Sequence, residues 1–402
     1  MRTGKIRPFV PNTLPLDLDW ESLIPLIGTA NRALASFDGA LYGMPNAELL
    51  LAPLTTQEAV LSSRIEGTQA TFGEVLKFEA GEEPEQESRR LDIQEILNYR
   101  TALHVAEQEL QSRPFNLNLL LQLHNVLLNS VRGRDKGRGR FRTIQNWIGR
   151  PGSPIQQAAY IPPEPLRIRP LLDNWEKYYH AERPDPLVQL AMLHGQFEII
   201  HPFVDGNGRI GRILIPLFLF ERKLLSRPVF YLSAYIEEHK DEYVEGLGAL
   251  SSKQDVDAWT RWVKFFLQAV TEQAKKNLDA ARSIIDLYEK SKAEIIKVTH
   301  SQHAVPLLDV LFEQPVFSPV QLLRRAGMPS KQMIMSLLGR LRDAGILTVT
   351  RAASGRRPQI LAFAELVNLC EGHEVFPTPR ARRGVKVRVK AGARPEVRNR
   401  AR

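Results

Sequence analysis

The segment His201–Arg212, HPFVDGNGRIGR, determines how the rest of the chain is interpreted. Two glycines, Gly206 and Gly208, flank Asn207, and an apolar run typical of a buried helix follows at once. Glycines let successive backbone N–H groups turn inward, and the start of a helix adds its positive end. The segment therefore predicts an anion site, which suits the phosphates of a nucleotide.

The charged side chains of this segment add chemistry to the anion site. Arg209 and Arg212 are three residues apart, so they share one side of the predicted helix and can both contact phosphate oxygens. Asp205 supplies the hard oxygen ligand that Mg²⁺ prefers. His201 titrates near neutral pH and can take a proton from an incoming hydroxyl. The pattern predicts a general base beside a nucleotide and its metal.

A dinucleotide-binding loop is a weaker interpretation of the same glycines. Gly206, Gly208 and Gly211 satisfy G-x-G-x-x-G, but that fingerprint needs a strand before it and an acidic residue after a second strand. The preceding segment, 187–200, has the pattern of a helix. This interpretation is therefore disfavoured.

A metal site made of protein side chains is also disfavoured. His194, Glu198 and His201 could share a helix face, but Pro202 ends that helix near residue 200 and no H-E-x-x-H spacing occurs. An ordinary core histidine is the simplest alternative for His201. The glycines and charged residues that follow it argue against that alternative.

Most of the chain before residue 300 shows helical periodicity, which predicts a mainly α protein. The predicted helices cover residues 22–34, 57–76, 93–110, 117–131, 186–200, 209–223 and 256–291. The acidic stretch 81–90 and the Gly- and Arg-rich stretch 132–142 are expected to be exposed connections. Residues 145–165 have two short β-prone runs around RPGSP, as a hairpin would.

The pattern changes from about residue 302. A short helix is followed by Ser318-Pro319, an N-cap and first helical residue, and by Ser330, a second N-cap. The last helix stops at Gly345, and ILTVT and PQILAF then alternate as two strands around SGRRP. Three helices and a two-stranded wing are typical of a winged helix-turn-helix.

The net charge of +9 is concentrated at the end of the chain. From Pro377 to Arg402, eight Arg and two Lys accompany one acid, Glu396, so the other residues are electrically balanced. This tail is poor in large apolar residues and is predicted to be disordered, either idle or attracted to nucleic acid or acidic proteins. Cys370 is the single cysteine, which excludes an intrachain disulfide and fits a reducing compartment. Without a signal-like or membrane-length apolar run, we expect a cytoplasmic protein with no membrane partner.

The signature segment resembles the Fic family pattern HPFx[D/E]GNGRxxR at every fixed position. The resemblance implies a helical core that transfers AMP from ATP, with Mg²⁺, to Ser, Thr or Tyr hydroxyls of a target protein or of the enzyme itself. It makes His201 the general base, Phe203 a core anchor and Asp205 the Mg²⁺ ligand. The implied ATP-binding residues are Gly206, Asn207, Gly208, Arg209, Ile210, Gly211 and Arg212.

Two further segments resemble parts of the family. Gly139–Pro165 is similar to its flap, a hairpin that pairs with the target backbone. The expected docking residues are Gln145, Trp147, Tyr160, Ile161 and Pro162. The segment Ser62–Gly67, SSRIEG, resembles the inhibitory motif [S/T]xxxE[G/N].

The inhibitory resemblance implies that Glu66 pairs with Arg212, with Ser62 and Gly67 completing the motif. A carboxylate in a bidentate pair with Arg212 would take the place of the γ-phosphate and spoil the alignment of ATP. In some members of the family the same glutamate orients a water that removes AMP, and the sequence does not separate the two roles. We therefore predict an autoinhibited protein adenylyltransferase.

The expected fold is mainly α: a Fic-type helical core with a β-hairpin flap, plus a C-terminal winged helix-turn-helix. The predicted parts are an N-terminal helical domain with the inhibitory motif, the catalytic core, a connecting helix, the winged helix and the basic tail, at residues 1–90, 91–255, 256–300, 301–370 and 371–402. A homodimer is an additional expectation.

Three questions stay open at this stage. The winged helix could make the protein a DNA-binding regulator with the core as a nucleotide sensor, or it could bind a protein. Its phosphate-contacting candidates are Lys331, Arg340, Arg342, Arg351, Arg356 and Arg357, whereas core positions are expected at Met333, Ile334, Met335, Leu337 and Leu338. The group transferred could be a phosphate or another nucleotide. The candidates for the wall of the base pocket are Tyr231, Tyr235 and Tyr243.

Overall fold

The computed structural model describes residues 8–44, 46–129, 136–150, 152–252, 255–325 and 327–378. The longer helices are α1 Trp20–Tyr42, α2 Ala47–Ile65, α4 Glu87–Leu110, α5 Leu117–Leu127, α6 Pro165–His180, α7 Pro186–Ile200, α8 Asn207–Glu221, α10 Lys240–Leu250, α11 Val256–Thr299, α12 Ala304–Glu313 and α14 Lys331–Asp343. The shorter ones are α3 Phe72–Glu79, α9 Ser233–Glu238, α13 Pro319–Leu323 and α15 Ala364–Glu371, with a 3₁₀ turn at Ile155–Gln157. The strands β1 Val316–Phe317, β2 Thr348–Arg351 and β3 Ile360–Ala362 form one antiparallel sheet in the order β1–β3–β2. The prediction of a mainly α protein is confirmed.

Helices α7 and α8 form the buried centre and place the signature segment between them. Asp185 caps α7 by accepting hydrogen bonds from the N–H groups of Leu187 and Val188, both at 2.9 Å. Every residue of α7 after Pro186 is buried, as is most of α8, because both helices are apolar on most faces. His201 ends α7 with a left-handed φ of 48°, which turns the chain back toward α8. The loop between the two helices therefore begins and ends at buried helix ends.

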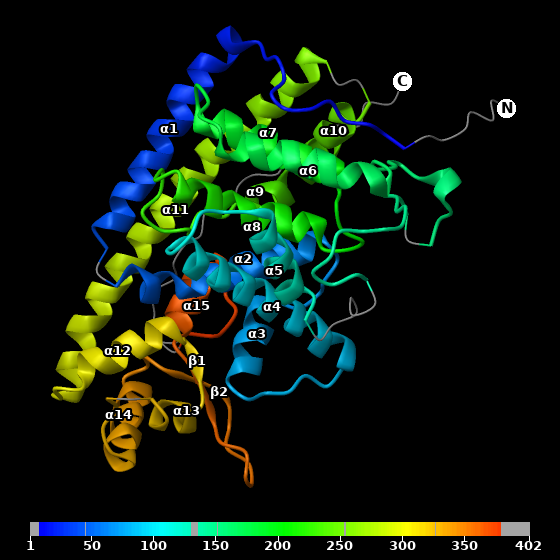
Figure 1. Cartoon of the computed structure of the whole chain (residues 1–402). Helices are drawn as coiled ribbons and strands as arrows, with labels where there is room; N and C mark the ends of the chain where they lie inside the picture. The colour runs from blue at the N-terminus through cyan, green and yellow to red at the C-terminus, as the bar shows by residue number, and fades with distance from the viewer. Residues whose placement is uncertain are drawn as a thin grey trace, which may run out of the picture.

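Two long helices support this centre. Helix α11 spans 44 residues and lies beside α1 along one edge of the molecule (Figure 1). It thus packs against the N-terminal part as well as connecting to the C-terminal part. The buried apolar side chains form one cluster that extends from Leu14 to Phe376. Because this single cluster crosses every domain boundary inferred from the sequence, it does not divide the chain at any of them, and those boundaries remain predictions.

The predicted helix 57–76 is wrong as a single element. Helix α2 begins earlier and ends at Ile65, after which Glu66 closes the last turn and Gly67 adopts a φ of +102°. Only glycine adopts that conformation readily, so the helix cannot continue. Helix α3 starts afresh from a capping box in which Thr71 and Glu74 exchange hydrogen bonds. Glu66 therefore lies at a helix end and not on a helix face.

Several other boundaries differ from those predicted. Helix α4 begins at Glu87, so the acidic connection between α3 and α4 is shorter than the predicted 81–90. Helix α5 ends at Leu127. In the Gly- and Arg-rich stretch, residues 136–140 form a turn, 141 and 142 are irregular, and 132–135 lie outside the described residues. No helix in the described ranges is long and apolar enough to cross a bilayer.

The C-terminal part has the elements that the sequence predicts, with two additions. The caps at Ser318 and Ser330 are confirmed: Ser318 forms a capping box with Gln321, and Ser330 accepts from the N–H of Met333. Strand β1 and helix α15 were not predicted. Of the expected core residues of α14, Ile334, Leu337 and Leu338 are buried. Met333 and Met335 are instead 43% and 42% exposed. The name winged helix remains a prediction.

The predicted disordered tail begins too early. Residue 371 is the end of α15, and Phe376 is only 5% exposed. The side-chain oxygen of Asn368 accepts hydrogen bonds from the N–H groups of Val375 and Phe376 at 2.8 and 3.0 Å. Val375 and Phe376 are thus held in place, whereas residues 372–374 and 377 are exposed, and 379–402 lie outside the described residues.

The crossing of α7 and α11 gives a stability prediction. A Cβ at Gly195 would lie 2.8 Å from Nε1 of Trp262, which is buried and hydrogen-bonded to Ala191. Gly195→Ala should therefore destabilise the protein by about 1–3 kcal/mol, measured by urea unfolding. Gly39→Ala, in helix α1 with nothing within 4 Å of the new Cβ, should instead stabilise by about 0.5–1 kcal/mol. Equal effects of the two substitutions would contradict the close packing at Gly195.

Candidate functional site

His201 lies where α7 ends, and its surroundings keep it neutral. Burial, reinforced by the positive charge of Arg142, lowers the pKa of His201 to about 4. Its Nδ1 atom is buried and has no hydrogen-bond partner among the described residues. The backbone oxygen of His201 accepts from Nε of Arg142 at 2.9 Å, which holds the residue in place. A neutral imidazole in this position can accept a proton near pH 7.

The loop after His201 is held by side chains that fold back on it. The amide of Asn207 accepts from the N–H of Phe203 at 2.8 Å and donates to its oxygen at 2.9 Å. The ring of Phe203, fully buried as predicted, stacks on His124 with centroids 3.8 Å apart. The N–H of Gly139 donates to Nδ1 of His124, so Nε2 carries the proton and donates to the oxygen of Asp205 at 3.0 Å. The Asn207 side chain therefore shapes the loop through its oxygen and one of its N–H groups, and its contact with phosphate stays a prediction.

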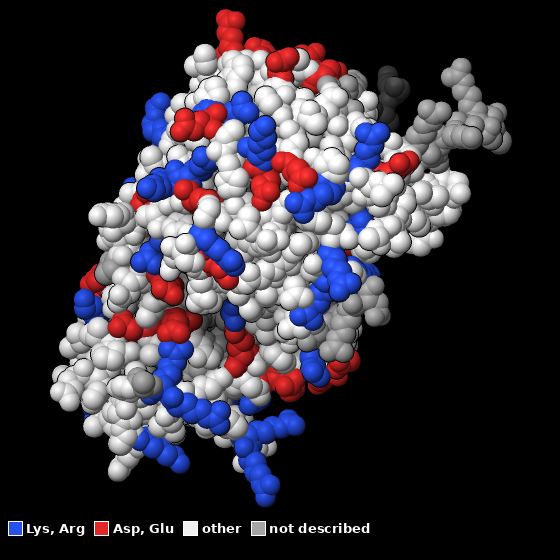
Figure 2. Space-filling model, in the orientation of Figure 1, with Lys and Arg blue, Asp and Glu red and all other residues white. Residues whose placement is uncertain are grey.

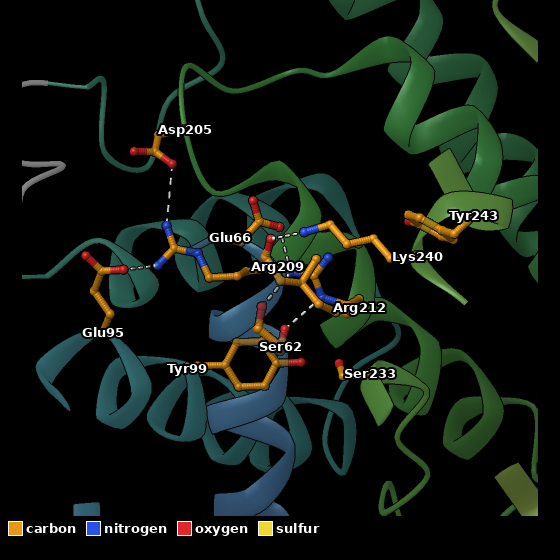
Figure 3. Close-up of polar contacts among 12 residues, drawn as sticks. Ser62, Glu66, Glu95, Tyr99, Asp205, Arg209, Arg212, Ser233, Lys240 and Tyr243 are labelled. Carbon is orange, nitrogen blue, oxygen red and sulfur yellow. Dashed lines mark hydrogen bonds and ion pairs between the residues drawn. The ribbon is translucent and has the colours of Figure 1, made fainter. Parts of the chain in front are cut away.

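Asp205 and Arg209 belong to a chain of charges on one side of the loop (Figure 3). Asp205 accepts from Lys136 at 2.8 Å and lies 3.4 Å from Arg209, whose other nitrogen is 3.1 Å from Glu95. Burial opposes ionisation of Asp205, but the hydrogen bond from Lys136 and the charge of Arg209 outweigh it and lower its pKa. Sequence reasoning missed Lys136 and Glu95, because their distance in the chain from the signature gives no signal.

The fit of Mg²⁺ to this site depends on the nucleotide. Asp205 is an ionised oxygen ligand, which suits a hard cation. In the described part of the chain, however, no three His, Cys, Asp or Glu residues gather as a metal site. A magnesium ion here would take most of its ligands from phosphate oxygens and water, so Asp205 alone stays the predicted protein ligand.

Arg212 is held by the end of helix α2, as the sequence predicts. Its Nη2 lies 2.7 Å from Oε1 of Glu66 and donates to the backbone oxygen of Ser62 at 2.9 Å, and its Nε donates to the Ser62 hydroxyl at 2.8 Å. Only one oxygen of Glu66 is engaged, so the predicted bidentate pair is wrong in detail, because Ser62 takes the second nitrogen. Lys240 donates to the oxygen of Ile65 at 3.3 Å and closes the same helix end (Figure 3).

Electrostatics favours the charged forms of this pair. The Arg212 side chain is 2% exposed, and although burial opposes its charge, Glu66 raises its pKa. Burial likewise opposes ionisation of Glu66, but the charge of Arg212 and its hydrogen bond lower the pKa of that carboxyl. The Glu66 side chain is 40% exposed, so one partner is buried and the other is open to solvent.

The glycines of the signature make room for carboxylates. A Cβ at Gly208 would lie 2.3 Å from Oε1 of Glu66, so this carboxylate lies against the start of α8, where phosphate is predicted. A Cβ at Gly211 would lie 2.2 Å from Oε1 of Glu198. That oxygen of Glu198 has no partner among the described residues, and burial raises its pKa to about 7. Because the Glu66 carboxylate lies against Gly208, Glu66 and a nucleotide phosphate would compete for the same position at the start of α8.

A second buried carboxylate anchors helix α2. Glu58 is 3% exposed, and its Oε1 accepts from the hydroxyls of Tyr99 at 2.9 Å and Ser233 at 2.6 Å. These contacts join α2 to α4 and α9. Burial raises the pKa of Glu58 to about 7 despite the two hydrogen bonds. Sequence reasoning missed this residue, whose one signal is a lone acid in the apolar stretch EAVLSS.

The described residues of the flap segment, Gly139–Pro165, form an antiparallel bridge and not the hairpin of two strands that the sequence predicts. One bridge, Ile148 with Tyr160, joins its sides, and a 3₁₀ turn lies between them. The hydroxyl of Tyr160 donates to the oxygen of Ile199 at 2.7 Å, and Gln145 donates to the oxygen of Pro162 at 2.9 Å. Gly149 on one side and Pro162 and Pro163 on the other limit strand pairing. Of the predicted docking residues, Trp147 is 42% exposed, whereas Ile161 is buried.

A cavity of about 630 Å³ lies between the flap segment, α7 and α10. Its lining includes Phe9, Ile148, Tyr160, Glu198, Val244 and Leu247. None of the three tyrosines expected in the base pocket lines it: Tyr231 bonds to Thr55, Tyr235 stacks on His239, and the hydroxyl of Tyr243 lies 2.9 Å from His194. Glu198 lines the cavity and also lies against Gly211, so this residue links the cavity to the signature segment, none of whose residues is among the lining ones.

The chain matches two models of one family. Residues 24–108 match the Fic/DOC family N-terminal domain and residues 114–219 match the Fic/DOC family domain. Among curated proteins, the protein adenylyltransferase Fic of Culex quinquefasciatus is 27% identical over 192 residues, covering 47% of this chain and 31% of that protein. A probable protein adenylyltransferase of Aquifex aeolicus is 28% identical over 185 residues, covering 44% of this chain and 52% of that protein. The chain thus spans about half or less of the length of these relatives.

Solved structures show the same fold. A Fic family protein from Desulfovibrio desulfuricans G20 superposes with a TM-score of 0.51 at 21% identity, covering 89% of this chain and 98% of that one. Residues 134–508 of Fic-1 from C. elegans superpose with a TM-score of 0.50 at 18% identity, covering 67% and 75%. At these identities the likeness concerns the fold alone.

The buried Glu58 gives a prediction about pH. Its raised pKa means that the folded protein keeps a proton that the unfolded chain releases above about pH 4.3, so its contribution to stability is lost as pH rises toward 7. Glu58→Gln has no such proton. The free energy of unfolding of Glu58→Gln relative to wild type should therefore increase by up to about 3 kcal/mol between pH 5 and pH 8, measured by urea unfolding. A difference that does not change with pH would contradict the buried carboxyl.

Proposed function

Since the chain belongs to the Fic/DOC family, we propose that it is a protein adenylyltransferase that its own helix α2 holds inactive. The observation that carries this proposal is the geometry of the signature segment. A neutral His201 and the glycine turn at the start of α8 lie together, and Glu66 occupies the place against Gly208. The similarity to protein adenylyltransferases of other organisms supports the same reaction.

In the proposed reaction, a hydroxyl oxygen of the target attacks the α-phosphorus of ATP. A bond forms between that oxygen and phosphorus, the bond from the α-phosphorus to the bridging oxygen of the β-phosphate breaks, and pyrophosphate leaves. His201 accepts the proton of the hydroxyl, which its low pKa allows because the imidazole is already neutral. A bound magnesium ion, with Asp205 as one ligand, would offset the negative charge of the phosphates.

The base of the nucleotide is proposed to lie in the cavity beside Glu198. Apolar walls from Ile148, Val244 and Leu247 suit a flat heteroaromatic ring, and a carboxyl and the Ser251 hydroxyl supply polar contacts. The backbone N–H groups that begin α8 and the Arg212 side chain then lie on the phosphate side. In this proposal the sugar lies between the base cavity and the start of α8.

Inhibition follows from the place of Glu66. While its carboxylate lies against Gly208 and pairs with Arg212, a phosphate cannot use either group. Its exposed position lets the carboxylate move into solvent when α2 shifts. The same carboxylate could orient a water that removes AMP from a modified protein, which remains the second direction proposed for this site.

The experiment is transfer of label from α-³²P-ATP with Mg²⁺, followed by intact-mass spectrometry. Glu66→Gly and Glu66→Ala should label the protein itself or a partner at least tenfold faster than wild type, because Arg212 is freed for phosphate. Glu66→Gly/His201→Ala should lose that label. Glu66→Ala separates loss of the carboxylate from added backbone freedom.

Two controls sharpen this test. Glu85→Ala removes an exposed acid from the connection between α3 and α4 without touching Arg212 or a helix cap, so it should match wild type. A mass increase of one AMP supports adenylyl transfer, whereas an increase of one phosphate would assign another reaction. Equal labelling with and without His201 would contradict the proposal.

A DNA-binding regulator is the second candidate function, and surface charge is the observation that favours it. Figure 2 shows Lys and Arg side chains at the lower end of the molecule, where Figure 1 places the C-terminal sheet and α14. Lys331, Arg356 and Arg357 are exposed there. The other candidates form hydrogen bonds within the chain. Arg340 and Arg351 donate to the backbone oxygens of Thr299 and Gly81, and the exposed Arg342 donates to the side chain of its neighbour Asp343.

Duplex binding tests this candidate. Arg356→Glu/Arg357→Glu should weaken binding of a DNA duplex and reduce its dependence on salt, because two phosphate contacts are lost. Met333→Ser/Met335→Ser is the matched control on exposed apolar side chains of α14. Binding that follows the methionines and ignores salt would assign this part of the chain to protein recognition.

A further inference from the structure

The described residues before α1, Pro8–Asp19, form an extended segment, which we call the strap. Asn174 on α6 donates to the oxygen of Leu14 and accepts from its N–H, both at 2.8 Å. Gln196 on α7 donates to the oxygen of Asn12 at 2.8 Å. Leu14 and Leu18 are buried. Side chains of two core helices thus hold the strap in one register.

The far end of the strap reaches the flap segment. The N–H of Phe9 donates to the oxygen of Ile161 at 2.9 Å, as a neighbouring strand would. The Phe9 ring meets Tyr160 edge to face, with centroids 5.9 Å apart. The flap segment is therefore in contact with residues that precede it by about 150 positions in the chain.

This contact makes the strap part of the lining of the cavity beside Glu198. Pro8, Phe9 and Val10 form one wall of the 630 Å³ space, with Tyr160 beside them and Glu198 among the facing residues. The strap residues bring apolar and aromatic surface, and the cavity has few polar groups. An aromatic base gains both from burial and from contact with aromatic rings.

We propose that the strap is a specificity element of the nucleotide site, in which Phe9 forms a wall of the base cavity and favours a purine. This inference rests on the proposed function, because it assigns the base to that cavity. A purine offers a larger ring surface than a pyrimidine, so loss of the Phe9 ring affects ATP more than CTP. Phe9 is a binding residue, and Asn174 is a positioning residue that acts through the strap.

The test measures equilibrium binding of ATP and CTP by calorimetry, with Mg²⁺, in the Glu66→Gly protein. Phe9→Ala should raise the Kd for ATP about 3- to 10-fold, which corresponds to one aromatic contact, and should change the Kd for CTP less. Asn174→Ala, which frees the strap without touching the cavity, should shift both in the same direction. Thr13→Ala is the matched control, since it lies on the exposed side of the same strap and outside the cavity.

Two readouts keep a structural role apart from a binding role. Phe9→Leu keeps apolar surface without the ring, so it should retain the melting temperature of the Glu66→Gly parent and still lower the preference for ATP over CTP. Saturating ATP should restore the labelling rate of Phe9→Ala, because KM changes and kcat does not.

The outcomes separate the two proposals. Tight ATP binding that is the same for Phe9→Ala and Thr13→Ala would overturn the role of the strap and leave the proposed function standing. No ATP binding by the Glu66→Gly protein with its strap intact would overturn both. A Kd change in Phe9→Ala that Phe9→Leu fully reverses would show that burial, and not ring contact, is what Phe9 contributes, and would overturn the purine preference.

Discussion

A buried arginine needs an anion, and much of this structure is arranged around that need. Arg212 is 2% exposed, and an unpaired guanidinium there would be costly. Glu66 supplies the charge and Ser62 supplies two hydrogen-bond acceptors, all from the last turn of α2. The position of α2 therefore fixes the state of the signature segment. Behind it, Glu58 joins α2 to Tyr99 and Ser233, so the helix is held along its length.

The same helix brings the C-terminal part into contact with the site. Helices α12 and α15 both pack on α2, and Gln57 donates to the oxygen of Cys370 at 2.7 Å (Figure 1). The segment between α3 and α4 meets strand β2 through Arg351, which lies 3.7 Å from Glu82. A partner bound to the C-terminal part would thus lie against the elements that carry Glu66. The domain pattern drawn from the sequence cannot show this, because contacts between distant segments leave no local periodicity.

Local chemistry made part of the site predictable. The signature residues and the pairing of Glu66 with Arg212 could be read from motifs, since each role requires a particular residue type. The end of α2 at Glu66 could not, because apolar spacing continues from residue 57 to 76 and only Gly67 marks the break. The contacts of Lys136 with Asp205 and of Glu95 with Arg209 could not be predicted, because folding brings distant segments together. The hydrogen bond from Phe203 to Asn207 depends likewise on the folded loop. Met333 and Met335 were misplaced because their apolar side chains fit a core equally well.

On the proposed function, activation exchanges one anion for another. When Glu66 leaves Arg212, a phosphate of ATP takes its place against Gly208, so the buried cation keeps a partner in both states. The equilibrium then depends on the difference between two anionic partners and not on the much larger free energy of burying an unpaired charge. Glu66, at 40% exposure, loses little when it returns to water, whereas Arg212 cannot leave the core. A small displacement of α2 is therefore sufficient to shift the balance.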